Sequence, residues 1–154
     1  MHIYKREFAE SEGTELILPS GTTEQCWAIG FPPEGKITRF ILQQSAGSNV
    51  GATVNLLDRQ VCQAGSGSSA SLSAADPMAI ELAQIFPEQT LTSGNTLSLR
   101  AGLDDGGPWS YRNREGSFSV PVRAVYLFLN IDAGNADGKQ FELAIECQMG
   151  GELN

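Results

Sequence analysis

The feature that most constrains the fold is a strict alternation of side chains near the C-terminus, in residues 140–148. Every second position there is apolar and the intervening ones are polar or small; the apolar set is Phe141, Leu143, Ile145 and Cys147. A period of two is the side-chain period of a β-strand, and a single apolar face means that one side packs on a core. We therefore predict a half-exposed strand over residues 140–148.

The preceding stretch, residues 124–131, is apolar on both faces and so needs a cover on each side. A neighbouring subunit is a natural second cover for a domain of this size. The sequence therefore favours oligomerisation, with Tyr126 and Phe128 as partner-binding candidates. Residues 132–138, between the two stretches, are rich in Asp, Asn and Gly, which favour turns. The pattern predicts an antiparallel hairpin that pairs 124–131 with 140–148.

Short β-branched or alternating stretches recur along the chain, bounded by Gly, Pro, Ser or Asn, as in sandwiches and barrels. The segments expected to form strands are residues 2–8, 15–18, 25–30, 37–43, 52–58, 80–86, 96–100, 118–122, 124–131 and 140–148. Residues 76–86 also carry a helix-start signal at Asp76 and Pro77, so one helical turn followed by a strand is expected there. Residues 63–73 are expected to form a surface loop. We predict a single all-β domain over residues 1–154, an antiparallel two-sheet β-sandwich of the jelly-roll type.

The charge balance argues against several classes of partner. With 18 acidic and 10 basic residues the formal net charge is −8, which disfavours binding to nucleic acid or to an anionic membrane. We find neither a signal-peptide pattern nor an apolar stretch of the roughly 20 residues that span a bilayer. The three cysteines lack a CxxC spacing, so we expect buried thiols from a reducing cytoplasm and no zinc site. No phosphate-binding or dinucleotide motif occurs, and no cofactor is predicted.

The inventory of catalytic side chains predicts that the chain is not an enzyme. The one histidine is His2, at a terminus that frays unless it is held, so a Ser-His-Asp or Cys-His arrangement lacks a well-placed base. One histidine is also too few for the multi-histidine metal sites of many jelly-roll enzymes, cupins among them. A glycosidase needs only two carboxylates, which 18 acidic residues supply by number, and it is the third functional hypothesis.

Residues 132–138, with Asn130 just before them, gather oxygen ligands of the kind that calcium prefers. The same Asp and Asn residues suit a turn for conformational reasons alone. We favour the turn over a calcium site, and we interpret residues 104–107 in the same way.

Trp109 and Tyr111 lie in a polar, glycine-rich stretch, residues 106–114. Exposed aromatic rings on a sandwich can hold the flat face of a sugar, so the alternative function is a carbohydrate-binding or receptor-binding module that uses these two side chains. In the interpretation that we favour, Trp109 is instead tucked under its own loop or into a subunit contact. Trp27 is expected in the core.

The N-terminus combines cationic and aromatic side chains in an otherwise acidic chain: Tyr4, Lys5, Arg6 and Phe8. This mixture is typical of an anchoring contact, so residues 1–12 are a candidate anchoring arm and these four residues are partner-binding candidates. An edge strand that lysine and arginine protect from sheet-to-sheet aggregation explains the same residues equally well.

Two passages, residues 85–99 and 122–132, resemble the small jelly-roll cement or decoration proteins on the capsids of tailed bacteriophages. The resemblance implies a homotrimer at capsid three-fold positions that binds the major capsid protein and reinforces the shell without catalysis. It also implies a place on the capsid surface of the virion after synthesis in the host cytoplasm. That family offers no motif with fixed positions, so no residue role is carried over.

Overall fold

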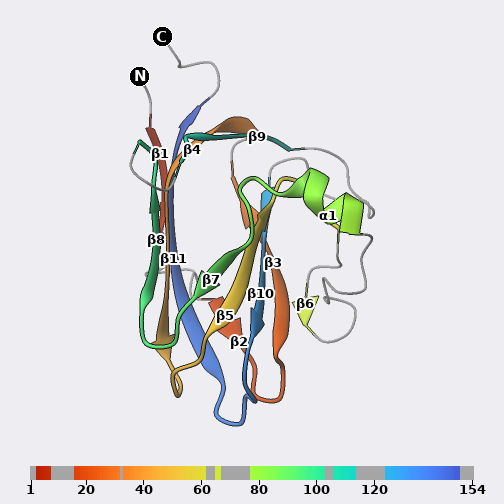
Figure 1. Cartoon of the computed structure of the whole chain (residues 1–154), viewed down its shortest axis with the longest axis vertical. Helices are drawn as coiled ribbons and strands as arrows, with labels where there is room; N and C mark the ends of the chain where they lie inside the picture. The colour runs from red at the N-terminus through yellow and green to blue at the C-terminus, as the bar shows by residue number, and fades with distance from the viewer. Residues whose placement is uncertain are drawn as a thin grey trace.

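Strands in two antiparallel sheets make up most of the chain in the computed structural model (Figure 1). The structure describes residues 3–7, 16–31, 33–61, 65–66, 77–102, 106–113 and 124–149, with the backbone alone for 3–7, 65–66 and 149. In chain order the elements are β1 (Ile3–Glu7), β2 (Leu16–Leu18), β3 (Glu24–Gly30), β4 (Glu34–Ala46), β5 (Ala52–Leu57), β6 (Gly65–Ser66), α1 (Pro77–Ala83), β7 (Gln89–Leu91), β8 (Thr96–Arg100), β9 (Trp109–Arg112), β10 (Ala124–Ile131) and β11 (Lys139–Met149).

The first sheet, sheet A, has the order β1-β11-β4-β8, with β2 also paired to β11 and β9 also paired to β4. The second, sheet B, has the order β6-β3-β10-β5-β7. Every pairing is antiparallel. The predicted all-β fold with two antiparallel sheets is thus confirmed.

The predicted hairpin between residues 124–131 and 140–148 is wrong. Both strands are present, but β10 pairs with β3 and β5 in sheet B, whereas β11 pairs with β1, β2 and β4 in sheet A. Residues 132–138 therefore cross from one sheet to the other. Both edges of β10 are already occupied by neighbours in its own sheet, so no edge is left for β11.

The main core lies between the two sheets and contains the alternating side chains of β11. Phe141, Leu143, Ile145 and Cys147 are at most 2% exposed, so the predicted half-exposed strand is confirmed. From β10, Val125, Leu127, Leu129 and Ile131 enter the same core. Three aromatic rings extend the core from β4 to β9, because Phe86 packs edge-on against both Phe40 and Trp109, with centroids 5.2 and 5.4 Å apart.

The second face of β10 is covered by α1 of the same chain, where the sequence suggested a neighbouring subunit. Tyr126 and Phe128 are 1% and 2% exposed and form a second cluster with Leu57 and Ala83. Figure 1 shows α1 on the outer side of sheet B. Tyr126 and Phe128, named as partner-binding candidates, are thus buried within the described chain, and neither side chain offers an exposed surface.

The last turn of α1 is tied to β5 by backbone hydrogen bonds. The amide of Asp58 donates to the carbonyl of Ala83 at 2.8 Å, and the amide of Ile85 donates to that of Leu56 at 2.9 Å. The expected helical turn is thus a seven-residue helix, and the strand expected after it is reduced to one bridge between Leu57 and Gln84. The apolar face that Ala83 buries favours continuing the helix over starting a strand.

Two further expectations change. Residues 109–112, expected as loop, form β9, because Tyr111 turns inward and is 5% exposed. The loop expected over residues 63–73 includes the two-residue strand β6. The strand expected at 118–122 lies outside the described residues.

The second cluster should be a measurable part of the stability. Phe128→Ala is expected to lower the free energy of unfolding by about 3–5 kcal/mol, because a cavity replaces the ring beneath α1. Tyr126→Phe should leave stability unchanged or raise it, since the Tyr126 hydroxyl is buried without a hydrogen-bond partner among the described residues.

Urea unfolding followed by circular dichroism measures both variants. Ser98→Ala, on the exposed side of β8, is the control and should stay within about 0.5 kcal/mol of the parent. A Phe128→Ala variant as stable as this control contradicts the assignment of α1 as a cover.

Candidate functional site

Four turns meet at one end of the sandwich, the lower end in Figure 1, and we call them the loop end. They are residues 19–23, 47–51, 92–95 and 132–138, which join β2 to β3, β4 to β5, β7 to β8 and β10 to β11. Their outward side chains are small, and the four turns contain no lysine or arginine. Three of the four turns are held together by side chains that are buried between them.

Asn135 ties the β10–β11 turn to the β2–β3 turn. The residue is 6% exposed, and its Nδ2 lies 3.3, 2.8 and 2.9 Å from the carbonyl oxygens of Leu18, Pro19 and Thr22, to which it donates. In return the amide of Gly21 donates to the carbonyl of Asn135. One amide side chain thereby donates to three backbone carbonyls next to the neighbouring turn, of which that of Pro19 also accepts from the amide of Thr22.

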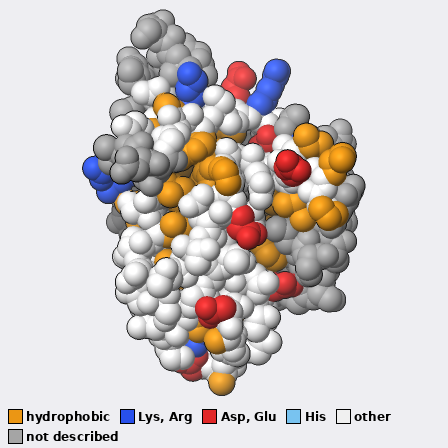
Figure 2. All heavy atoms as spheres, viewed as in Figure 1, with side chains coloured by type: hydrophobic (Ala, Val, Ile, Leu, Met, Phe, Trp, Pro, Cys, Tyr) orange, Lys and Arg blue, Asp and Glu red, His pale blue; other side chains and the backbone are white. Residues whose placement is uncertain are grey.

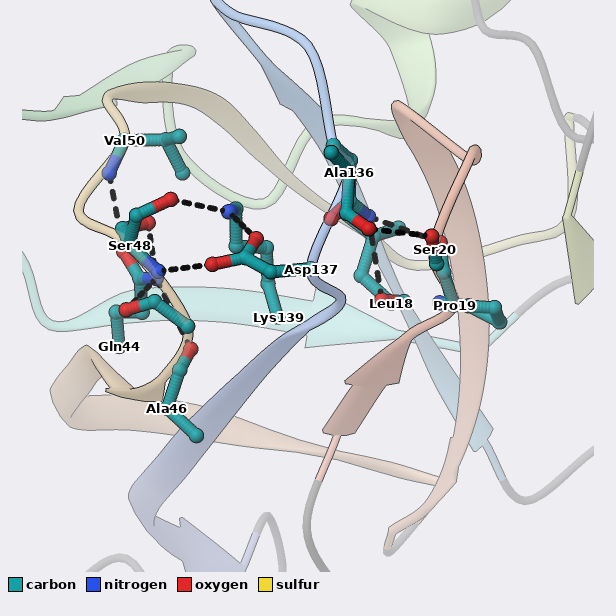
Figure 3. A network of polar contacts seen from close by, with 12 residues as sticks. Leu18, Pro19, Ser20, Gln44, Ala46, Ser48, Val50, Ala136, Asp137 and Lys139 are labelled. Carbon is teal, nitrogen blue, oxygen red and sulfur yellow. Dashed lines mark hydrogen bonds and ion pairs between the residues drawn. The ribbon is translucent and has the colours of Figure 1, made fainter.

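Lys139 ties the same turn to the β4–β5 turn (Figure 3). It is 2% exposed, and its ammonium group donates to the Ser48 hydroxyl at 2.8 Å and to the Asp137 carboxylate. The amide of Ser48 also donates to Asp137, at 2.8 Å. These bonds, from Lys139 first and then from Ser48, hold the pKa of Asp137 well below its usual range.

Gln44 shapes the β4–β5 turn from within. Its Nε2 donates to the carbonyl oxygens of Ala46 and Ser48, and its Oε1 accepts from the amide of Val50. Gly47 has a φ of 89°, and a Cβ there would collide with the carbonyl oxygen of Gly138. The two turns therefore touch through their backbones.

The acidic residues of the loop end serve the turns themselves. Asp132 Oδ1 accepts from the amide of Gly51 at 3.1 Å, and Asp137 binds Ser48 and Lys139 as described above. Among the described residues, no three or more of His, Cys, Asp and Glu gather where they could hold a metal ion. Asp104 and Asp105 lie outside the described residues.

The N-terminal candidates lie on β1, at one end of the order of sheet A. In the register with β11, Tyr4 stands opposite Cys147, Lys5 opposite Glu146 and Arg6 opposite Ile145. This placement agrees with an edge strand. Phe8 and the rest of the expected arm, residues 1–2 and 8–12, lie outside the described residues.

The two aromatic residues considered for sugar binding do not form an exposed pair. Tyr111 is 5% exposed; its ring packs against Phe31, and its hydroxyl lies 3.8 Å from the Cys147 sulfur. Trp109 is half-buried, packed against Phe86 and lying over Gly107. The favoured interpretation, with Trp109 tucked under its own loop, agrees with these contacts.

Cys26 and Cys147 are free and buried, as expected, while Cys62 lies outside the described residues. Burial raises the pKa of Cys147, and the hydrogen bond with Tyr111 opposes this shift. Trp27, expected in the core, is only partly buried against it.

No protein-family model matches the chain, and a search of curated proteins found no match either. Within the described part of the chain, no helix has the length and apolar character needed to cross a membrane.

Sequence reasoning missed the residues that hold the loop end together. For Lys139 a signal existed, since it precedes Phe141 in the inward set of β11 and an inward lysine needs a partner. The sequence contained no such signal for Asn135 or Gln44, because their acceptors are backbone carbonyls that only the folded chain brings near.

Asn135→Ala is expected to lower the free energy of unfolding by about 2–4 kcal/mol, because the buried hydrogen bonds that join the two turns are lost. Asn49→Ala is the matched control, since Asn49 is exposed in the neighbouring turn, and it should change stability by less than about 0.5 kcal/mol. Chemical unfolding compares the two. Equal stabilities for the two variants would show that Asn135 does not hold the turns.

Asp137→Asn should change how stability depends on pH. A carboxyl whose folded pKa is depressed adds stability above its unfolded pKa of about 3.9 and loses that contribution as the pH falls towards the folded value. The melting temperature of the parent should therefore be higher than that of Asp137→Asn at pH 5–7, and this difference should shrink towards pH 2. Thermal melts from pH 7 to pH 2 measure it, and two parallel curves contradict the assignment.

Proposed function

We propose that the chain is a structural virion protein of the jelly-roll type. In this proposal it binds the major capsid protein as a homotrimer, decorates the capsid surface and stabilises the shell without catalysis. It is made in the host cytoplasm and acts on the virion.

The observation that carries the proposal is the pairing of the eight strands that remain when β1, β6 and β9 are set aside. The first of these pairs with the last (β2 with β11), the second with the seventh (β3 with β10), the third with the sixth (β4 with β8) and the fourth with the fifth (β5 with β7). This first-with-last pairing is the strand order obtained when one long antiparallel hairpin folds over to form two sheets. It supports the jelly-roll assignment, the architecture of many capsid proteins.

The loop end supports a binding role. Joining strands does not require turns to be bonded to one another, yet here a buried lysine and a buried asparagine link them. Turns fixed in this way lose little conformational entropy when another protein contacts them, and their small side chains have few rotamers to lose. A rigid surface of this kind suits a protein whose task is to dock on an assembly.

The carbohydrate-binding alternative requires Trp109 and Tyr111 to be exposed together. Tyr111 is buried and Trp109 packs on its own loop, so the two residues do not support it. The enzyme hypothesis gains no cluster of side chains from the described residues. We therefore propose the assembly function alone.

Two measurements test the proposal. Sedimentation equilibrium at micromolar concentration is expected to give three times the chain mass of 16.5 kDa. Purified tailed-phage shells mixed with the protein should then bind it on co-sedimentation and resist heat better than bare shells.

Ala133→Arg, at the exposed tip of the β10–β11 turn, should weaken shell binding without lowering the melting temperature. Thr90→Arg, an exposed residue on β7, is the matched control and should bind as the parent does. If the protein sediments as a monomer and does not co-sediment with shells, the proposal is overturned.

A further inference from the structure

The strand β8 forms an edge of sheet A that lacks the usual protection against further pairing. Within the described part of the chain it pairs with β4 alone, from Arg39 opposite Arg100 to Gln43 opposite Thr96. Natural edge strands are protected by lysine or proline, by a bulge or by being very short. β8 has five residues, contains neither lysine nor proline, and shows no register shift against β4. Its regular outer edge is therefore suited to receive another strand.

Other strands at the sheet edges carry such protection. β7 has three residues and follows Pro87, and β6 has two residues. β1 contains Lys5 and Arg6, and β9 begins directly after Pro108. The one charged residue of β8 is Arg100, at the end of the strand. Of these edge strands β8 is thus the least protected.

The hydrogen-bond pattern determines which backbone groups of β8 face outward. The amide of Ala101, directly after the strand, donates to a carbonyl of β4 at 2.9 Å. Every second residue of an antiparallel pair bonds to its neighbour, so Leu99 and Leu97 also bond to β4. The N–H and C=O groups of Thr96 and Ser98 therefore point away from β4. Both of these residues are exposed, whereas the two leucine side chains lie in the core.

We infer that β8 pairs antiparallel with β8 of a second copy of this chain. About a twofold axis at Leu97, Thr96 of each copy stands opposite Ser98 of the other. The outward N–H and C=O groups of these residues then form two hydrogen bonds in each of the two pairs. The two Leu97 side chains meet on the core side of the sheet, and hydroxyl side chains meet on the outer side. The edge of one copy is thus complementary to the same edge of another.

The charge distribution supports a second copy as the partner of this edge. The chain has a formal net charge of −8, so two copies repel each other on average. Residues 92–99, which form the turn before β8 and most of the strand, contain no charged side chain. In the proposed register Arg100 stands opposite Gly94, so no like charges are opposed. In Figure 2 the lower half of the left edge, where β8 lies in Figure 1, is largely white.

The pairing is independent of the proposed function. In both copies β8 leaves the β7–β8 turn of the loop end, so an antiparallel pair turns the two loop ends in opposite directions. One shell surface cannot receive both, and the pair therefore belongs to the free protein. Each copy has one β8, so the contact is isologous and joins two copies. Because the strand has five residues, the contact is small and weak, and it is populated at about 1 mM.

The test is chemical cross-linking of the full chain at about 1 mM with a thiol reagent that spans about 10 Å. Ser98→Cys should give covalent dimers and no larger species, because the two introduced thiols lie about 8–9 Å apart in the pair. Thr90→Cys, an exposed position on the protected edge strand β7, is the matched control and should give few dimers. The parent has the same native cysteines and provides the background.

A second pair of variants isolates the hydrogen bonds between copies. Thr96→Pro, added to Ser98→Cys, removes an N–H that points away from β4 at the first residue of the strand, where proline is tolerated. Thr96→Ala is its matched control, since it loses the same side-chain bond to Gln43 and keeps the N–H. The dimer yield should be at least about tenfold lower with proline than with alanine, at similar melting temperatures.

Equal dimer yields from Thr96→Pro and Thr96→Ala overturn the inference, and so do equal yields from Ser98→Cys and Thr90→Cys. Cross-linked species larger than dimers, absent from the parent, also overturn it. If the proline variant does not fold, the comparison of Ser98→Cys with Thr90→Cys decides alone. A protein that forms these dimers but binds no shells overturns the proposed function and leaves the pairing in place, and the opposite result does the reverse.

Discussion

The structure depends on the burial of β10 on both faces. One face enters the core between the sheets, and the other is sealed by α1, so β10 must lie inside a sheet with β3 and β5 along its edges. The chain that leaves β10 then has no free edge to return along and crosses to sheet A. That crossing brings the turn at 132–138 against the turns at 19–23 and 47–51, and it places Lys139 at an inward position as β11 begins. The loop end is thus a consequence of where β10 lies.

Burying an ammonium group costs several kcal/mol, and an apolar residue at Lys139 would avoid that cost. The lysine is accommodated because Asp137, two residues before it, and Ser48 from the β4–β5 turn bind its ammonium group. An apolar side chain would pack equally well with the turns in several relative positions, whereas these hydrogen bonds have one geometry. The polar network therefore contributes specificity at the crossing, and the same rigidity makes the loop end suitable as a contact surface.

The sequence predicted what depends on local patterns. The period of two in β11 and the absence of a polar face in β10 were sufficient for the strands, for the all-β class and for the need of a second cover. These patterns did not identify the second cover, because Ala79, Ile80 and Ala83 form an apolar helix face only once Pro77–Ala83 is helical. The same patterns predicted a pairing of β10 with β11 that does not occur, because a turn-rich segment of seven residues can either close a hairpin or cross between sheets. Long-range acceptors, such as the carbonyls around Asn135, leave no trace in the sequence.

β11 connects the loop end to the rest of sheet A. It begins at Lys139 beside the turns and pairs with β4 from Gln140 to Met149, with register shifts after Gln140 and after Glu146. β2 and β1 pair with its other edge. Because both edges of β11 are paired, the loop end is fixed relative to the sheet, and a contact made at these turns acts on the whole domain.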